Sequence, residues 1–144
     1  MSAETVRDAM VPEPTTLAAD ANAQEAGRCF ADNGEVRAIF VTEDGGQLLG
    51  VVTRKTLVRG VVAAGLDPRG VALREIAEPP NFTLDAGLDL EGAFRFLEEE
   101  DLERVPVVEE GGRLVGVLSR AVVQRRLAED EPPEGEPEPG SVVL

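Results

Sequence analysis

The stretch GGQLLGVVTRKTLVRG, residues 45–60, occurs in a second form as GGRLVGVLSRAVVQRR, residues 111–126, and this pair decides the fold. Each copy has a Gly-Gly turn, a short apolar run through a glycine, a hydroxyl residue, an arginine and then a helical pattern. A strand that leads into a helix through a hydroxyl residue offers backbone N–H groups to an anion. The pattern therefore indicates binding rather than catalysis.

The resemblance between the two copies extends to the residues that precede them. LREIAEP, residues 73–79, resembles VRDAMVP at residues 6–12, and both lie before a short Thr-containing apolar segment. The two copies begin 66 residues apart, at residues 45 and 111. A repeat of this length is too long for a solenoid and indicates duplication of a small β-α-β-β-α unit. Each unit alone is near the lower size limit for a stable domain. We therefore expect an α+β fold in which two halves pack face to face as one body with pseudo-two-fold symmetry.

Local signals place the elements of the first copy. In chain order we expect a helical turn at 5–10, a strand at 15–17, a helix from a cap at Asp20 or Asn22 to about residue 33, a strand at 36–41, a turn at 43–46, a strand at 48–52, and a helix from 54 to about 64. Gly65, Pro68 and Gly70 then mark a linker.

Composition excludes several classes of function. The net charge of −14 argues against a nucleic-acid surface and against anionic lipid. The chain has no histidine and only one cysteine, Cys29, so an imidazole metal site, histidine acid–base chemistry and an internal disulfide are all excluded. No signal-peptide or membrane-spanning pattern is present. We expect a cytoplasmic protein that has no catalytic residues and is not an enzyme.

The last part of the sequence differs in character. Residues 129–144 alternate acidic residues and prolines before a short apolar end. Such a segment buries too little apolar surface to offset the entropy of ordering, so we predict disorder there.

The tandem pattern resembles a pair of cystathionine β-synthase-type (CBS) domains, also called a Bateman module. The resemblance covers about residues 5–128, with repeat 1 at 5–66, repeat 2 at 71–128 and the acidic tail at 129–144. It implies two intertwined halves and a homodimer formed through helices. It also implies clefts for AMP, ADP, ATP or S-adenosylmethionine, with no required cofactor, and a regulatory role toward a partner protein.

The ligand motif of that family is glycine, two apolar residues, Ser or Thr, two variable residues and then Asp. This chain keeps the hydroxyl in both copies, as Thr53 and Ser119, but has Thr56 and Val122 in place of the aspartate. An unpaired ribose hydroxyl costs on the order of 1–3 kcal/mol. Recognition of adenosine by the usual contacts is therefore weakened, more so in repeat 2.

The candidate ligand-binding residues come from both repeats. They are Thr16, Ile39, Thr53, Arg54, Lys55, Thr56, Thr83, Val105, Pro106, Ser119 and Arg120. Thr16 and Ile39 would contribute backbone contacts, and repeat 1 would supply the better site.

Each candidate also has a structural interpretation. Thr53 and Ser119 fit helix N-caps. Arg54 and Lys55 oppose the helix dipole, which is explained either by an anion between them or by pairing with nearby acidic residues. Phe40, which replaces a proline equivalent to Pro106, would either fill the cleft or stack on a base.

Two further functions stay open beside the sensor of a small anionic ligand. One is a structural interaction module with vestigial clefts, which the two missing aspartates favour. The other is an adaptor whose acidic tail, residues 129–144, docks on a basic partner.

Overall fold

The structure, a computed structural model, describes residues 4–12 and 14–130. The first half contains α1 (Val6–Ala9), β1 (Val11–Pro12), β2 (Thr16–Ala18), α2 (Ala23–Asp32), β3 (Ile39–Thr42), β4 (Leu48–Val52), α3 (Arg54–Leu57) and the π-helical turn η2 (Val58–Val62). The second half contains α4 (Leu73–Ile76), β5 (Leu84–Asp85), α5 (Leu90–Glu99), β6 (Arg104–Glu109), β7 (Arg113–Ser119) and α6 (Arg120–Asp130).

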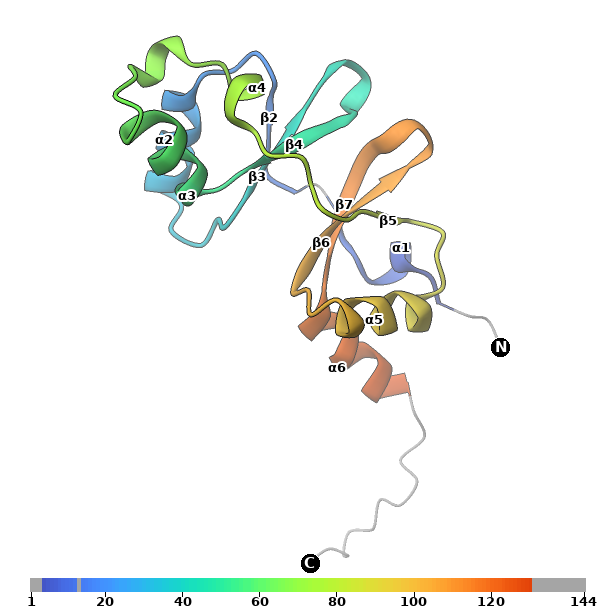
Figure 1. The fold of residues 1–144 in the computed structure, drawn as a ribbon. Helices are drawn as coiled ribbons and strands as arrows, with labels where there is room; N and C mark the ends of the chain where they lie inside the picture. The colour runs from blue at the N-terminus through green and yellow to red at the C-terminus, as the bar shows by residue number, and fades with distance from the viewer. Residues whose placement is uncertain (1–3, 13, 131–144) are drawn as a thin grey trace, which may run out of the picture.

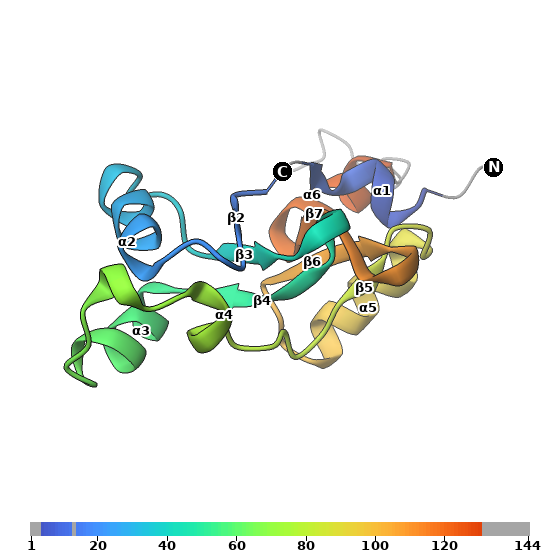
Figure 2. The same ribbon diagram turned by 90° about the horizontal axis from the view of Figure 1, so that it is seen from above.

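The strands form two sheets in the middle of the molecule. One sheet has the order β2-β3-β4 and the other has the order β1-β7-β6-β5. The helices of each repeat lie at opposite ends, with α2 and α3 at one end and α5 and α6 at the other (Figures 1 and 2). The predicted α+β fold of two repeats packed face to face is confirmed.

Each half contributes its first helix to the core of the other half. Helix α1 precedes the strands of repeat 1, but its Val6 and Ala9 pack in the core built from α5, β6, β7 and α6. Helix α4 precedes the strands of repeat 2, but its Leu73 packs in the core of repeat 1. Because the halves exchange these helices, neither core is complete without the other half.

The segment that follows each exchanged helix crosses a strand of the other repeat at a glycine. Val11 pairs with Val117 on β7, and Glu78 pairs with Val51 on β4. A Cβ atom on Gly50 would lie 2.8 Å from the carbonyl oxygen of Glu78, and one on Gly116 would lie 2.7 Å from the sulfur of Met10. The glycine in each apolar run is therefore required by the crossing chain.

Local signals explain where the longer helices begin. The side-chain oxygen of Asn22 accepts from the backbone N–H of Glu25 at 3.0 Å, which caps α2. Asp89 caps α5 in the same way through the N–H of Gly92, at 2.9 Å. Both helices present an apolar face to their core.

Several predicted boundaries differ in the structure. Strand β3 begins at Ile39 rather than residue 36, because residues 33–38 form the connection from α2. The helix expected from 54 to about 64 divides into α3 and the π-helical turn η2. Helix α6 continues through Asp130 and so includes the first two residues of the predicted tail, while residues 131–144 lie outside the described residues.

No helix within residues 4–12 and 14–130 combines the length and the apolar character needed to cross a bilayer.

Candidate functional site

A cleft of about 600 Å³ lies between the two repeats. Its walls are mainly apolar and come from both sheets and from the crossing segments. The apolar residues that form these walls include Val11, Phe40, Val51, Phe82, Pro106 and Val117. The volume is within the range of roughly 300–1,000 Å³ that small-molecule sites occupy. Phe40 is 7% exposed, so it fills part of this wall.

Two arginines from different repeats line the same cleft. Arg37 lies in the connection from α2 to β3, and Arg104 is the first residue of β6. Both are exposed, and neither side chain makes a hydrogen bond or ion pair with another described residue. Glu35 is the carboxylate among the lining residues. The cleft therefore combines an apolar interior with two guanidinium groups available to an anion.

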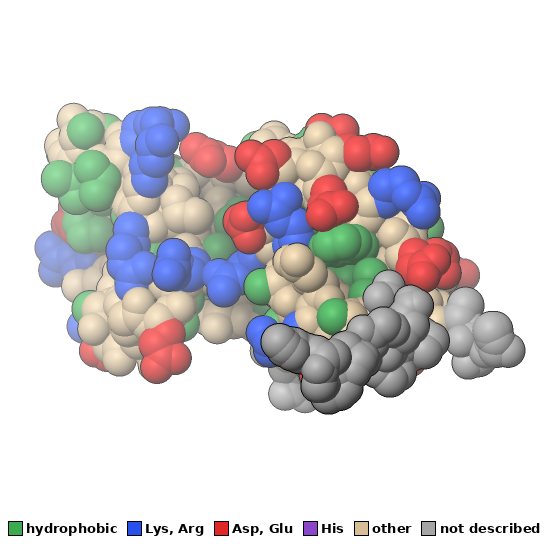
Figure 3. All heavy atoms as spheres, turned by 90° about the horizontal axis from the view of Figure 1, so that it is seen from below, with side chains coloured by type: hydrophobic (Ala, Val, Ile, Leu, Met, Phe, Trp, Pro, Cys, Tyr) green, Lys and Arg blue, Asp and Glu red, His purple; other side chains and the backbone are tan. Residues whose placement is uncertain are grey.

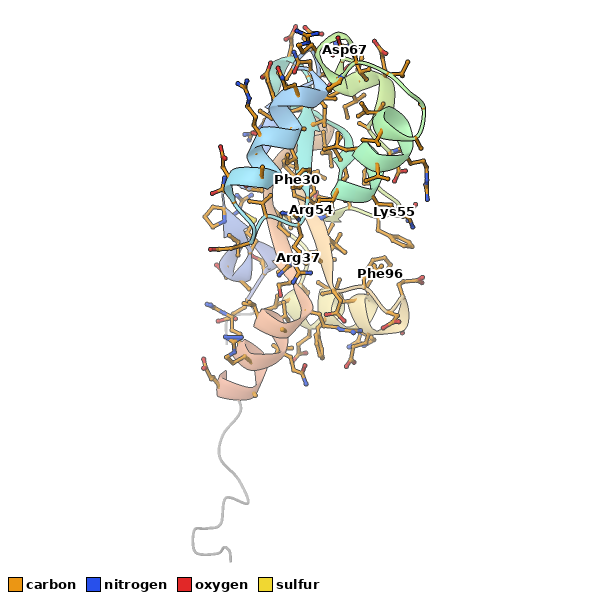
Figure 4. All side chains as sticks on the ribbon, turned by 90° about the vertical axis from the view of Figure 1, so that its left-hand side faces the viewer. Phe30, Arg37, Arg54, Lys55, Asp67 and Phe96 are labelled. Atoms are coloured by element: carbon orange, nitrogen blue, oxygen red, sulfur yellow. The ribbon has the colours of Figure 1, made fainter. Side chains whose placement is uncertain are left out.

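Arg37 and other basic side chains lie in the region between the two repeats (Figures 3 and 4). In Figure 4, Arg37 extends into the region between the two lobes, beneath Arg54, while Lys55 lies on the other side toward Phe96. Figure 3 shows Lys and Arg side chains gathered where the lobes meet, beside exposed apolar side chains.

The guanidinium of Arg54 is used within repeat 1. It donates to the carbonyl oxygens of Val36 at 2.7 Å and Phe30 at 3.1 Å. It also lies 4.7 Å from the centre of the Phe30 ring. These carbonyls belong to the C-terminal end of α2 and its connection to β3, where a positive charge is favourable. The interpretation of Arg54 as an anion ligand competes with this structural role.

Arg120 has the same role in repeat 2. It donates to the carbonyl oxygen of Leu97 on α5 at 3.4 Å and pairs with Asp101 and Glu103. Burial acts to lower the pKa of Arg120, but its hydrogen bonds and charge contacts with Glu103 and Asp101 raise the pKa overall. This is the pairing with nearby acidic residues that the sequence left open.

The two hydroxyls of repeat 1 satisfy each other. Thr53 is the N-cap of α3, its Oγ1 accepts from the backbone N–H of Thr56 at 3.2 Å, and the Oγ1 of Thr56 accepts from the N–H of Thr53 at 3.0 Å. Thr56 is 4% exposed and does not line the cleft. Ser119 caps α6 more weakly, through the N–H of Val122 at 3.4 Å, and both of these residues line the cleft.

The structure brings three of the predicted site residues into this cleft: Val105, Pro106 and Ser119. Thr16 and Thr83 are exposed outside it, although their neighbours Thr15 and Phe82 line it. Ile39 is fully buried in the core of repeat 1, and Lys55 is exposed on α3. The predicted residues that line the cleft thus all belong to repeat 2, although the lining as a whole comes from both repeats.

Sequence reasoning did not identify Arg37, Arg104 or Glu35. The available signal was an arginine near the start of a buried strand in both repeats, with Arg37 two residues before β3 and Arg104 the first residue of β6.

Comparison with known proteins identifies the family to which this chain belongs. The family model for the CBS domain matches residues 6–63 and again residues 73–129. The chain belongs to the CBS domain family, as a tandem pair. Proteins built from such pairs are generally regulatory modules rather than enzymes.

The chain is similar in sequence and in structure to a mycobacterial protein of this family. The chain is 33% identical over 95 residues to hypoxic response protein 1 of Mycobacterium tuberculosis, in an alignment that covers 66% of each chain. The crystal structure of hypoxic response protein I with two coordinated zinc ions has a TM-score of 0.72 at 28% identity, and the match covers 85% of this chain and 98% of that one.

Two other similar structures contain nucleotides. CBSX2 in complex with AMP has a TM-score of 0.68 at 25% identity, over 87% of this chain and 96% of that one. The cytosolic domain of the Mg²⁺ channel MgtE in complex with ATP has a TM-score of 0.64 at 26% identity, over 81% of this chain and 46% of that one.

The zinc of the mycobacterial relative has no equivalent ligand set among the described residues. No group of three or more His, Cys, Asp or Glu side chains within residues 4–12 and 14–130 has the arrangement of a metal site. The whole chain also lacks histidine, the commonest zinc ligand.

Proposed function

We propose that this chain is a regulatory CBS pair that binds a small anionic ligand in the cleft between its repeats. An adenine nucleotide such as AMP, ADP or ATP, or S-adenosylmethionine, fits the class of ligand, and no cofactor is required. The chain would signal to a partner protein by changing the packing of a homodimer formed through its helices.

One observation carries the proposal: Arg37 and Arg104 line one apolar cleft, and neither guanidinium group has a partner among the described residues. The chain has twice as many acidic residues as basic ones, 28 against 14. Arginines left unpaired in such an excess of carboxylates are available to an external anion. A guanidinium binds phosphate through two parallel hydrogen bonds, which favours a phosphorylated ligand.

The apolar walls define the rest of the ligand. Phe40, Phe82 and Pro106 offer flat apolar surface to a ring system such as a purine. Val122 lies at the family's aspartate position and accepts no hydrogen bond from a ribose. We therefore infer that affinity comes from the phosphate and the base more than from the ribose.

Calorimetry with AMP, ADP, ATP and S-adenosylmethionine tests the proposal directly. Replacing one arginine that holds phosphate removes charge-assisted hydrogen bonds worth about 1.5–3 kcal/mol, so Arg37→Gln and Arg104→Gln should each weaken binding roughly 10- to 100-fold. Arg28→Gln is the matched control, because the Arg28 side chain is also exposed and unpaired among the described residues but lies in the groove beside α2. Equal affinities for all three variants, or no heat with any ligand at millimolar concentration, would refute the proposal.

A structural interaction module is the second candidate, and the contacts of repeat 1 favour it. Arg54, Thr53 and Thr56 are engaged in contacts within the protein. This candidate expects a dimer whose melting temperature does not change with nucleotide, whereas a ligand that binds only the folded state raises that temperature.

A further inference from the structure

We propose that the acidic C-terminal segment, residues 131–144, docks in the cleft between the repeats and competes there with the anionic ligand. The competition rests on the proposed function, but the docking itself does not. The segment contains Glu131, Glu134, Glu136 and Glu138, has no Lys or Arg, and contains the apolar run 142–144. These are the two kinds of group that the cleft is suited to receive.

Charge distinguishes the cleft from the remaining surface. Residues 1–130 contain 14 basic and 24 acidic residues, since four of the 28 acidic residues belong to the segment, and so carry a net charge of −10. Most of the surface therefore repels four additional glutamates. The cleft differs because Arg37 and Arg104 outnumber its one carboxylate, Glu35.

The apolar part of the segment has a matching surface in the same place. The cleft walls include Phe40, Phe82 and Val117, next to the two arginines. A segment that places glutamates on the guanidinium groups can place Val142, Val143 or Leu144 against these walls. The groove between α5 and α6 is a poorer site for these glutamates, because Arg95 there is accompanied by Glu91 and Glu98.

The length of the chain permits this docking. Helix α6 begins beside the cleft, where Ser119 and Val122 form part of its lining. The 11 residues of α6 rise about 16 Å. A chain of 14 residues, the number that follow, reaches at most roughly 43 Å at the rise of a polyproline II chain. The segment is therefore long enough to return to the cleft from the end of α6.

The tether makes even a weak contact effective. A short linker holds an attached group at an effective concentration in the millimolar range. A free ligand must then displace the segment, so the cleft responds only above a threshold of ligand concentration. The apolar groove beside Arg28 is the alternative location for the segment, and the experiment distinguishes the two locations.

A spin label on the segment locates it without any nucleotide. In the full-length protein, Cys29→Ala removes the natural thiol and Ser141→Cys provides the attachment point for a nitroxide. We expect loss of amide NMR intensity at Val51, Val117 and Ser119, which returns when the four glutamates are changed to Gln. Unchanged intensities at these residues, or losses confined to the groove of α2 and η2, would overturn the proposal.

Nucleotide affinity gives the second readout. The variant with Gln at positions 131, 134, 136 and 138 should bind AMP roughly three- to tenfold more tightly than the natural sequence, because its segment competes less. Equal AMP affinity for the two proteins would overturn the competition. If neither protein binds AMP, ADP or ATP, the proposed function fails, and the spin-label measurement still decides whether the segment docks.

Discussion

The guanidinium of Arg54 donates to the carbonyl oxygen of Phe30 at 3.1 Å and lies 4.7 Å from the centre of the Phe30 ring. The same relationship recurs in repeat 2, where Arg120 donates to the carbonyl oxygen of Leu97 at 3.4 Å. In both repeats, the arginine that begins the second helix closes the C-terminal end of the first helix. This contact joins the two helices of each repeat.

Replacing Arg54 with alanine should destabilise the fold. The substitution removes donors from the carbonyls of Phe30, Val36 and Gly34 together with the ring contact. Because these groups are partly exposed to water, we expect a loss of about 1–2 kcal/mol rather than the full value for a buried charged hydrogen bond. Urea unfolding measures the change. Lys55→Ala is the control, because the exposed Lys55 side chain makes no such contact among the described residues. An equal loss in both variants would contradict the assignment.

The two crossing glycines should be the least replaceable glycines of the fold. A Cβ atom at residue 50 would meet the carbonyl oxygen of Glu78 at 2.8 Å, and one at residue 116 would meet the carbonyl oxygen of Val11 at 2.8 Å. The crossing chain must move to admit it, so Gly50→Ala and Gly116→Ala should each cost about 1–3 kcal/mol of unfolding free energy.

Gly27→Ala provides the matched comparison for these two variants. Gly27 lies inside α2, and a Cβ atom there would have no neighbour within 4 Å. Alanine is favoured over glycine in a helix by up to about 1 kcal/mol, so this variant should be at least as stable as the natural sequence. If all three variants lost similar stability in thermal unfolding, the close approach would not be the reason for the glycines.

Much of the fold could be predicted because the same pattern of turn, strand and helix residues occurs twice in the sequence. The Gly-Gly turns at Gly45 and Gly111 have positive φ values of 82° and 76°, as glycine at a tight hairpin permits. The exchange of α1 and α4 could not be predicted from local patterns, because it depends on contacts between distant parts of the chain. Val6, for example, packs in a core that also contains Leu118 and Val123.

The site was less predictable than the fold, for a physical reason. A cation at a helix N-terminus is an anomaly in the sequence, but the sequence does not show which group lies opposite it. The groups opposite the Arg54 guanidinium are backbone carbonyls of residues 18 to 24 positions earlier in the chain. Arg37 and Arg104 belong to no motif, and only the packing of the two repeats places them in one cleft.

The Thr53–Thr56 pair should contribute to stability and not to binding. Thr56 is buried, and its Oγ1 lies 3.0 Å from both the backbone N and the Oγ1 of Thr53. Thr56→Val keeps the shape but removes these bonds, so we expect a loss of about 0.5–2 kcal/mol in unfolding free energy. The affinity for AMP should stay unchanged, since Thr56 does not line the cleft. A tenfold weaker affinity in calorimetry would instead place the ligand at the start of α3.

Introducing a carboxylate at Val122 should create the ribose contact that the chain lacks. Val122 lines the cleft and occupies the third position of α6, where its N–H already donates to the Oγ of Ser119. An acidic side chain is favourable in the first turn of a helix, so Val122→Asp should fold normally. Satisfying ribose hydroxyls is worth about 1–3 kcal/mol, which predicts an AMP affinity roughly 5- to 150-fold above that of the natural sequence. The gain should disappear with 2′,3′-dideoxy-AMP, and Val122→Leu should show no gain with either ligand. A gain that persisted without the ribose hydroxyls would mean that the aspartate acts on another part of the ligand, and no gain at all would mean that the ribose lies away from α6.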